Sequence, residues 1–283
     1  MTVLSHTCGI GLRFPHIDQL LAEMPSIPWL EVLIDNFLRP GSVQQDYLFA
    51  IAEHYPLSFH GVGLSIGSTD PLNNTYLSYL KGLVDQLKPE RVSDHLCWTS
   101  VHGRVTHDLI PLPYTSQTIA YVANRIQQIQ DYLGRELVIE NVSSYLQYQQ
   151  STLTEWEFFS AVAEKADCGM LLDVNNIFVS AQNHQFNATD YLNGIPADRV
   201  RQVHLAGHED RGTHLLDTHG HPVSEPVWAL YRTALQQFGV LPTLIEWDND
   251  IPPLEVLLAE ANKAGKIQDE CHTSRTANNT NGF

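Results

Sequence analysis

Short apolar runs recur along the whole chain, and most of them lack the alternation of a half-buried strand. Runs of this length that are rich in Val, Ile and Leu are typical of parallel strands buried on both faces. Eight such runs are found, at residues 9–13, 29–34, 57–62, 91–97, 136–141, 169–174, 199–206 and 243–247. The pattern therefore predicts eight buried parallel strands.

The segments between these runs carry the apolar spacing of amphipathic helices. The clearest of them cover residues 42–54, 73–87, 116–133, 154–166, 225–238 and 253–264. Ser116 precedes one helix, Thr154 and Glu157 have the spacing of a capping box, and Gly134 and Gly239 follow two helix ends. Helix starts and stops thus agree with the periodicity.

Strands and helices alternate without a break in composition, which predicts an α/β fold of the (β/α)8 TIM barrel type in a single domain. A doubly wound open sheet is the weaker alternative. We expect the barrel to occupy residues 1–267, with the chemistry at the carboxyl ends of its strands. Residues 268–283 are polar and aperiodic, which predicts a flexible tail.

Composition narrows the class of partner. The chain has 16 basic and 32 acidic side chains and a formal charge of −16, which opposes binding to the phosphate backbone of nucleic acids. No run approaches the roughly 18 apolar residues that cross a bilayer, and the N-terminus lacks the pattern of a secretory signal. We therefore expect a cytoplasmic protein without nucleic-acid or membrane partners. The four cysteines form no C-x-x-C pair, so they predict neither a zinc knuckle nor a redox motif.

Residues of metal-ligand type stand near the carboxyl ends of six successive strands, where barrel enzymes place their chemistry. A first site would take two histidines and a carboxylate, namely His60, His95 and Glu140. A second would use Asp173, His204 and Glu246, with Glu140 as a bridge between the metals. A lone histidine at a strand end is usually just hydrogen-bonded, but buried carboxylates facing a pore are costly unless paired or bound to metal. Their recurrence at one end predicts a polynuclear metal site.

A third cluster follows the seventh strand. Asp217 and His219 form an Asp-x-His pair whose side chains can reach one ion. His208 and the amide oxygen of Asn176 could complete it. We expect no catalytic residue distinct from the ligands, and assign to the surrounding shell or to substrate binding Asp94, His107, Asn141 and His221.

Several of these motifs resemble one known family. They read Phe-His-Gly-Val-Gly-Leu-Ser-Ile-Gly, Ser-Asp-His-Leu, Ile-Glu-Asn-Val-Ser-Ser-Tyr, Leu-Leu-Asp-Val-Asn-Asn and Val-His-Leu-Ala-Gly-His. They are similar to those of the multinuclear non-haem iron-dependent oxidative enzymes, which include methanobactin-synthesis oxidases. This resemblance implies a barrel related to xylose isomerases and apurinic endonucleases, carrying two or three irons for which zinc or manganese could substitute.

The same resemblance implies an O2-dependent oxidase or oxygenase that modifies a side chain of a ribosomally made precursor peptide. Cysteine is the leading candidate for the modified residue. The resemblance also implies a small partner protein that binds the leader peptide. In the related endonuclease pattern a histidine stands where this chain has Asn176, and an oxygen donor there should favour iron or manganese over zinc mildly.

Three alternatives remain open from the sequence. A di- or trinuclear zinc phosphodiesterase or endonuclease would use the same ligands, although the acidic charge opposes it. A divalent-metal sugar isomerase would need more carboxylates and fewer imidazoles. A metal-binding or interaction protein without catalysis would bind metal but show no turnover.

Overall fold

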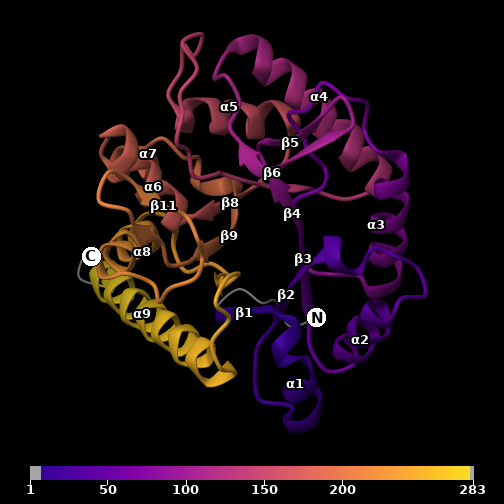
Figure 1. Cartoon of the computed structure of the whole chain (residues 1–283). Helices are drawn as coiled ribbons and strands as arrows, with labels where there is room; N and C mark the ends of the chain where they lie inside the picture. Colours follow the sequence, from indigo (N-terminus) through magenta and orange to yellow (C-terminus); the bar gives the residue numbers. More distant parts are fainter. Residues whose placement is uncertain (1–7, 281–283) are drawn as a thin grey trace.

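The computed structural model describes residues 8–280 and the side chains of residues 8–273. Eight parallel strands close into a barrel in the order β1-β12-β9-β8-β7-β4-β3-β2, and helices surround it (Figure 1). The barrel strands are β1 (Cys8–Leu12), β2 (Leu30–Leu33), β3 (Leu57–Gly61), β4 (Val92–His95), β7 (Val138–Glu140), β8 (Gly169–Asp173), β9 (Val200–Leu205) and β12 (Thr243–Ile245). All eight predicted strands and the TIM-barrel fold are confirmed.

The strand register brings the predicted ligands to one level. His95 is paired with Glu140 across β4 and β7, and Asp173 is paired with His204 across β8 and β9. On β3, His60 is the next-to-last residue. Because parallel strands end on the same side of a barrel, these side chains meet at its carboxyl-terminal mouth.

The helices form the outer layer. They are α1 (Ile17–Glu23), α2 (Val43–Ala52), α3 (Asn74–Leu87), α4 (Ser116–Leu133), α5 (Glu155–Ala166), α6 (Val174–His184), α7 (Ala188–Asn193), α8 (Glu225–Phe238) and α9 (Leu254–Thr280). Short 3-10 helices cover Phe14–His16, Ile34–Phe37 and Ala197–Arg199. The six predicted helices are confirmed, and α1, α6 and α7 are additional.

Helix-end chemistry follows the sequence at most positions. Thr154 and Glu157 form a capping box at the start of α5. Gly134 ends α4 with a φ of 70°, and Gly239 ends α8 with a φ of 87°; both angles favour glycine. One detail was wrong, since Thr115 rather than Ser116 caps α4, accepting a hydrogen bond from the backbone N–H of Thr118.

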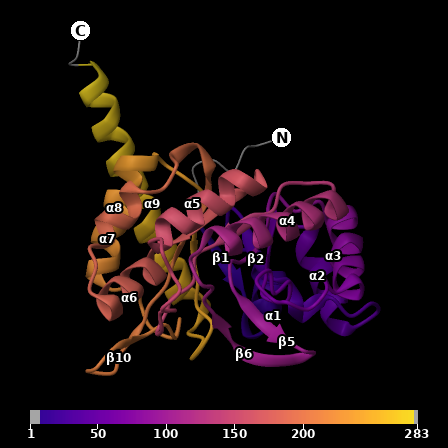
Figure 2. The ribbon, with the colours of Figure 1, turned by 90° about the horizontal axis from the view of Figure 1, so that it is seen from above.

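Two small antiparallel sheets lie at the mouth outside the barrel. One pairs β5 (Trp98–Val101) with β6 (Arg104–Ile110), and the other pairs β10 (Glu209–Asp210) with β11 (Leu215–Leu216). Both project from the same end of the molecule, opposite the end from which the last turns of α9 extend (Figure 2). The β5–β6 register shifts between Trp98 and Ser100, and residues of both strands line the cavity above the predicted ligands.

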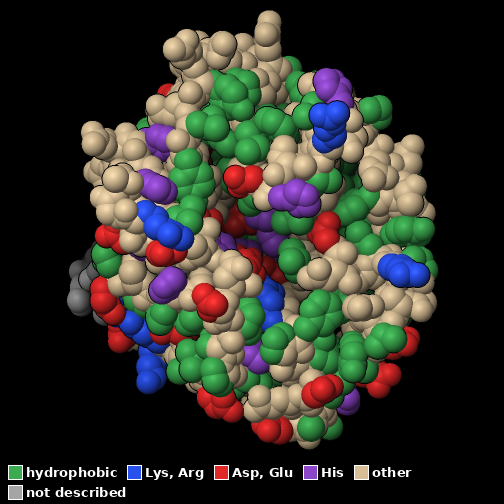
Figure 3. Space-filling model, viewed as in Figure 1, with side chains coloured by type: hydrophobic (Ala, Val, Ile, Leu, Met, Phe, Trp, Pro, Cys, Tyr) green, Lys and Arg blue, Asp and Glu red, His purple; other side chains and the backbone are tan. Residues whose placement is uncertain are grey.

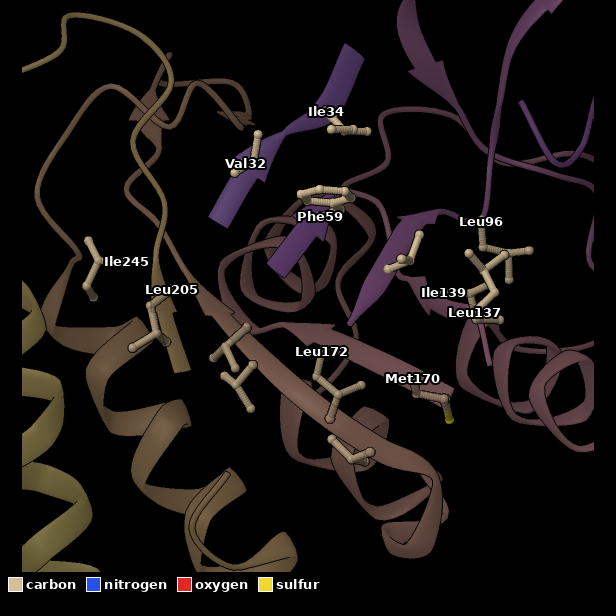
Figure 4. Packing of buried hydrophobic residues seen from close by; sticks show 14 of the residues in the cluster. Val32, Ile34, Phe59, Leu96, Leu137, Ile139, Met170, Leu172, Leu205 and Ile245 are labelled. Carbon is tan, nitrogen blue, oxygen red and sulfur yellow. The ribbon is translucent and has the colours of Figure 1, made fainter. Parts of the chain in front are cut away.

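The barrel is held by a core in which strand and helix side chains interlock. Figure 4 shows Val32, Phe59, Ile139, Leu172 and Leu205 on five strands around the barrel, and all five belong to one cluster of buried hydrophobic residues. Each is almost completely buried. At about 25 cal/mol per Å² of apolar surface, burial of such side chains contributes roughly 1.5–3 kcal/mol each, which makes the barrel a rigid support for the mouth.

The C-terminal segment departs from its predicted lack of regular structure. Helix α9 continues past Gln268 to Thr280, and Ile267, Gln268 and Cys271 within it are buried. Mobility of residues 268–280 stays a prediction, and residues 281–283 of the predicted tail lie outside the described residues. Within the described chain no helix has the length and apolarity needed to cross a membrane.

Candidate metal centre

The first group of ligand-type side chains consists of His60, His95 and Glu140. The Nε2 atoms of the two histidines lie 3.2 and 3.3 Å from Glu140 Oε2. All three side chains are buried, and one ligand atom from each lies within 4.8 Å of the others. Strands β3, β4 and β7, which are neighbours in the barrel, supply them. The group could hold one metal ion.

The second group shares Glu140 with the first. Its other members are Asp173, His204 and Glu246, again within 4.8 Å of one another and buried. The Nδ1 atom of His204 lies 2.9 Å from Glu246 Oε2 and 3.5 Å from Glu140 Oε1. The two oxygens of Glu140 thus face different groups, as a bridging carboxylate requires.

A third set surrounds His219, whose backbone has a φ of 47° that is uncommon outside glycine. Its Nε2 lies 2.7 Å from Asp217 Oδ1 and 3.9 Å from Asp173 Oδ2. Its Nδ1 lies 3.0 Å from Asp248 Oδ2 and 3.5 Å from Glu246 Oε2. His219 could therefore bind a metal ion in two ways. It could use Nε2 beside Asp217 and Asp173, or Nδ1 together with Glu246 and Asp248.

Buried polar atoms without a hydrogen-bond partner test whether these residues fit a metal ion. Buried atoms without a hydrogen-bond partner include His60 Nε2, both carboxylate oxygens of Glu140, Asp173 Oδ2, Asn176 Oδ1 and His219 Nε2. Buried polar atoms are seldom left in this state, and six of the fifteen such atoms among the described residues belong to the predicted ligand set. The residues fit metal ions. At the third position His219 Nε2 faces Asp217 and Asp173, whereas its Nδ1 is hydrogen-bonded to Asp248.

The far nitrogen of each histidine has a defined partner, which is the usual arrangement behind metal-bound imidazoles. His60 Nδ1 lies 2.8 Å from Ser93 Oγ, and His95 Nδ1 lies 3.1 Å from the carbonyl oxygen of Gly61. His219 Nδ1 is 3.0 Å from Asp248, whose carboxylate also accepts a hydrogen bond from Arg13. These contacts orient the rings.

Burial and neighbouring charges shift the pKa values of the titratable groups in the site. Burial raises the pKa of Glu140 and of Asp173 and lowers the pKa of His60 and His95. Burial alone would lower the pKa of His204, but the neighbouring carboxylates outweigh it and hold this pKa well above its usual value. Burial thus disfavours the negative charges of Glu140 and Asp173 unless a cation lies beside them, which fits a site for metal ions.

The outer residues predicted from the sequence have varied positions. Asn141 forms two hydrogen bonds with the backbone of Asp173, each 3.0 Å long. Asp94 is fully buried and accepts hydrogen bonds from the backbone N–H groups of His95 and Leu64, so it supports the backbone of a ligand. His107 lines the cavity above the site.

Two predicted residues are not brought into the groups. His208 Nδ1 lies 2.7 Å from Asn175 Oδ1, and Asn175 in turn donates to Asp217 Oδ1. Asn175 thus stands between His208 and the third set, so His208 reaches Asp217 only through that amide. His221 is exposed and is absent from the described residues that line the cavity.

Sequence reasoning missed Glu31, Asp248, Gln202 and Arg13. Glu31 is buried and its Oε1 lies 2.9 Å from His204 Nε2. Asp248 stands two residues after Glu246, a spacing that in an extended segment points both side chains to one side and was therefore a usable signal. Glu31 lies in mid-strand, and Arg13 and Gln202 offered no local signal.

The cavity above the groups has a volume of about 740 Å³. Hairpin residues Thr99, Val105, His107 and Leu109 form part of its wall, and Tyr145 forms another part. Acidic, histidine and basic side chains meet in the hollow at the centre of this face (Figure 3). Arg13 contacts Glu246 and Asp248, two of the lining residues, so the cavity offers a substrate polar, charged and apolar contacts.

The sequence from residue 7 to residue 269 matches the family described as RiPP precursor modification enzyme MbnB/TglH/ChrH, where RiPP denotes a ribosomally synthesised and post-translationally modified peptide. This match confirms the resemblance seen in the motifs. A UPF0276 protein of Acaryochloris marina is 53% identical over 256 residues, covering 90% of this chain and 92% of that protein. A UPF0276 protein of Anaeromyxobacter is 48% identical, with 92% of each chain covered.

Solved structures share the fold at low identity. An L-ribulose 3-epimerase superposes with a TM-score of 0.62 at 14% identity, covering 96% of this chain and 97% of that chain. Endonuclease IV from Thermus thermophilus gives 0.60 at 14% identity, with 93% and 99% covered. A xylose isomerase domain protein from Salmonella typhimurium gives 0.59 at 14% identity, with 94% and 97% covered. The barrel prediction is confirmed.

Proposed function

This chain belongs to the family of RiPP precursor modification enzymes MbnB/TglH/ChrH, and on that basis we propose that it is an iron-dependent oxidase or oxygenase acting in the cytoplasm on a precursor peptide. The side chain that it modifies is a cysteine. O2 is the oxidant, and the active site holds two or three irons. Family membership supports peptide modification, and the metal-ligand groups support the cofactor.

One observation carries the proposal. Six buried polar atoms of Glu140, His60, Asp173, Asn176 and His219 have no hydrogen-bond partner, and all of them belong to residues at the shared mouth of the barrel. His60, His95 and Glu140 would hold one iron, and Glu140, Asp173, His204 and Glu246 a second. Asn176, Asp217 and His219 would hold a third. This mixture of imidazole and carboxylate donors suits non-haem iron.

Bound iron would supply O2 activation and an electrophilic partner for the substrate thiolate. The chain's own residues provide the site for that chemistry. Ser93, Gly61 and Asp248 orient three of the histidine rings, and Asn141 fixes the backbone of Asp173. Rings held this way need little rearrangement when they bind the cofactor.

The peptide would enter through the cavity between hairpin β5–β6 and Tyr145. Leu33, Val62 and Leu109 give part of this cavity an apolar wall, which limits water around the reacting group. His107 is exposed on the same wall. A cavity of about 740 Å³ is wide enough for a few residues of an extended peptide, and we propose that a small partner protein binds the leader segment outside it.

The zinc phosphodiesterase alternative receives less support. Similarity to endonuclease IV at 14% identity concerns the fold alone. A formal charge of −16 disfavours a polyanionic substrate.

The direct test is co-expression of the chain with short cysteine-containing peptides encoded beside its gene, followed by mass spectrometry of each peptide. A mass change that requires O2, iron and the peptide's cysteine is expected. A Cys→Ser peptide and the Glu140→Ala enzyme serve as controls. A mass change that persists in the Cys→Ser peptide would contradict the assignment of cysteine, and no change in any peptide by the iron-loaded enzyme would contradict the proposed activity.

A further inference from the structure

Asp217 differs from the inner candidate ligands in the kind of segment that carries it. His60, Glu140 and His204 lie within barrel strands, whereas Asp217 lies on the long connection between β9 and α8, directly after β11. Side chains on strands are held more precisely than side chains on loops. A ligand on this connection therefore needs anchors from neighbouring elements.

Two hydroxyl groups on the segment after β7 contact Asp217. The backbone N–H of Asp217 donates a hydrogen bond to the hydroxyl oxygen of Tyr145 at 2.9 Å. The hydroxyl of Ser143 donates to Asp217 Oδ2 at 3.0 Å. The two hydroxyl oxygens lie 3.3 Å from each other. These contacts form a closed ring that starts at the backbone of Asp217 and returns to its carboxylate.

The direction of each hydrogen bond in this ring is determined. A backbone N–H only donates, and a carboxylate only accepts. The hydroxyl hydrogen of Ser143 is used toward Asp217, so Tyr145 donates to Ser143 at the remaining contact. Each hydroxyl then donates once and accepts once. Hydrogen bonds linked in this way strengthen one another, and the ring holds the carboxylate in one direction relative to its own backbone.

The ring leaves the other carboxylate oxygen turned toward the third set. Asp217 Oδ1 lies 2.7 Å from His219 Nε2, a buried atom without a hydrogen-bond partner. The side-chain amide of Asn175 also donates to Oδ1, at 2.8 Å. Oδ2 is thus held by Ser143, while Oδ1 faces the nitrogen that would share a metal ion with it.

We propose that Ser143 and Tyr145 are positioning residues that fix Asp217 for the third metal position. Carboxylates that bind metals are usually held by such hydrogen bonds, and these outer partners contribute to metal affinity. This proposal rests on the metal centre of the proposed function. It identifies what turns a carboxylate on a connecting segment into a ligand that is already oriented.

Packing alone does not explain the place of Tyr145. Its side chain is 43% exposed and lines the cavity, so its ring contributes little to the core. Among the hydrogen bonds between described residues, those of the Tyr145 and Ser143 hydroxyls go to Asp217 or to each other. Both hydroxyls are therefore directed to one candidate ligand.

The first test is amide hydrogen exchange of the metal-free protein, followed by 1H–15N NMR. Tyr145→Phe removes the acceptor of the Asp217 N–H and keeps the aromatic ring, so this amide should lose protection and exchange faster. Tyr132→Phe, at an exposed tyrosine of α4, is the matched control and should leave the exchange of Asp217 unchanged. Unchanged exchange of Asp217 in Tyr145→Phe would overturn the proposal.

The second test is zinc affinity by chelator competition, with the third position identified as the one that Asp217→Ala loses. Ser143→Ala and Tyr145→Phe should each weaken zinc at this position about 10- to 100-fold and leave the other positions unchanged. Tyr132→Phe should change none of them. Unchanged affinity at the third position would refute the positioning role, and so would equal weakening of all positions, which a merely structural role would give.

Circular dichroism verifies the folding of each variant. Tyr145→Phe deletes one oxygen atom of a half-exposed side chain, so it carries the test if Ser143→Ala, at a buried position, is unfolded. Full zinc binding by Asp217→Ala would show that Asp217 is not a ligand and would also overturn the proposal. No measurement uses O2 or a peptide, so failure of the proposed oxidase activity would be seen separately from failure of this proposal.

Discussion

Replacement of Glu140 by Ala should remove more than one metal, because this carboxylate belongs to two groups. Its Oε2 lies 3.2 and 3.3 Å from the ligand nitrogens of His60 and His95, and its Oε1 lies 3.5 Å from that of His204. The variant would leave two donors in the first group and three in the second. Loss should therefore be greater at the first position than at the second.

The expected size follows from the ligand count. Loss of a residue behind a ligand already weakens a metal about 10- to 100-fold. Loss of a direct ligand should weaken each of two positions at least about 100-fold, which is about 2.8 kcal/mol per position at 1.4 kcal/mol for each tenfold change. Asp217→Ala is the matched comparison, because Asp217 contacts His219 and belongs to neither group that contains Glu140.

The assay is elemental analysis and chelator titration after anaerobic reconstitution with Fe(II), with circular dichroism of each metal-free variant to verify folding. Glu140→Ala should lose the first iron and bind the second weakly, whereas Asp217→Ala should lose the third alone. Equal losses in the two folded variants would refute the bridging role of Glu140.

Three other changes have defined outcomes. Asn176→His replaces an oxygen donor with an imidazole and should raise the zinc-to-iron ratio bound in a competition experiment; an unchanged ratio would show that Asn176 is not a ligand. Burial raises the pKa of Glu155 from its usual 4.5 to about 7, so ionisation opposes folding and stability falls as the pH rises through this interval. The fall in stability amounts to up to about 3 kcal/mol at 1.36 kcal/mol per pKa unit, and Glu155→Gln should abolish it. Urea unfolding at pH 5 and pH 8 measures the difference; the same fall in the variant would show that Glu155 is not its cause. Thr154→Ala removes a capping box and should lower the free energy of unfolding by about 1 kcal/mol, whereas Ser224→Ala, at a cap without a side-chain capping bond, should cost less; equal costs would contradict the assignment.

The barrel and the meeting of the inner candidate ligands at its mouth could be predicted because their signals are local. Buried parallel strands read as apolar runs, and a ligand near the end of each run reaches the mouth whatever the loops do. His60, His95 and Glu140 met this condition on three neighbouring strands. To predict that these three side chains meet, only the order of the strands in the barrel was required.

The outer shell could not be predicted in the same way. Glu31 lies within β2, and its place in the site is seen only from its contact with His204 across the barrel. Arg13 and Asp248 meet although they are 235 residues apart. His208 lies in a stretch as rich in ligand types as that of His219, but the neighbouring side chain of Asn175 stands between it and the third set. Such contacts depend on side-chain directions that local sequence does not determine.

Metal content tests the central claim most directly. Protein purified without oxygen from cells grown in 57Fe should contain two or three irons per chain, with Mössbauer signals of both Fe(II) and Fe(III), bound at the groups around Glu140, His204 and His219. Stoichiometric zinc with little iron in the same preparation would contradict the oxidase and favour metal-assisted hydrolysis.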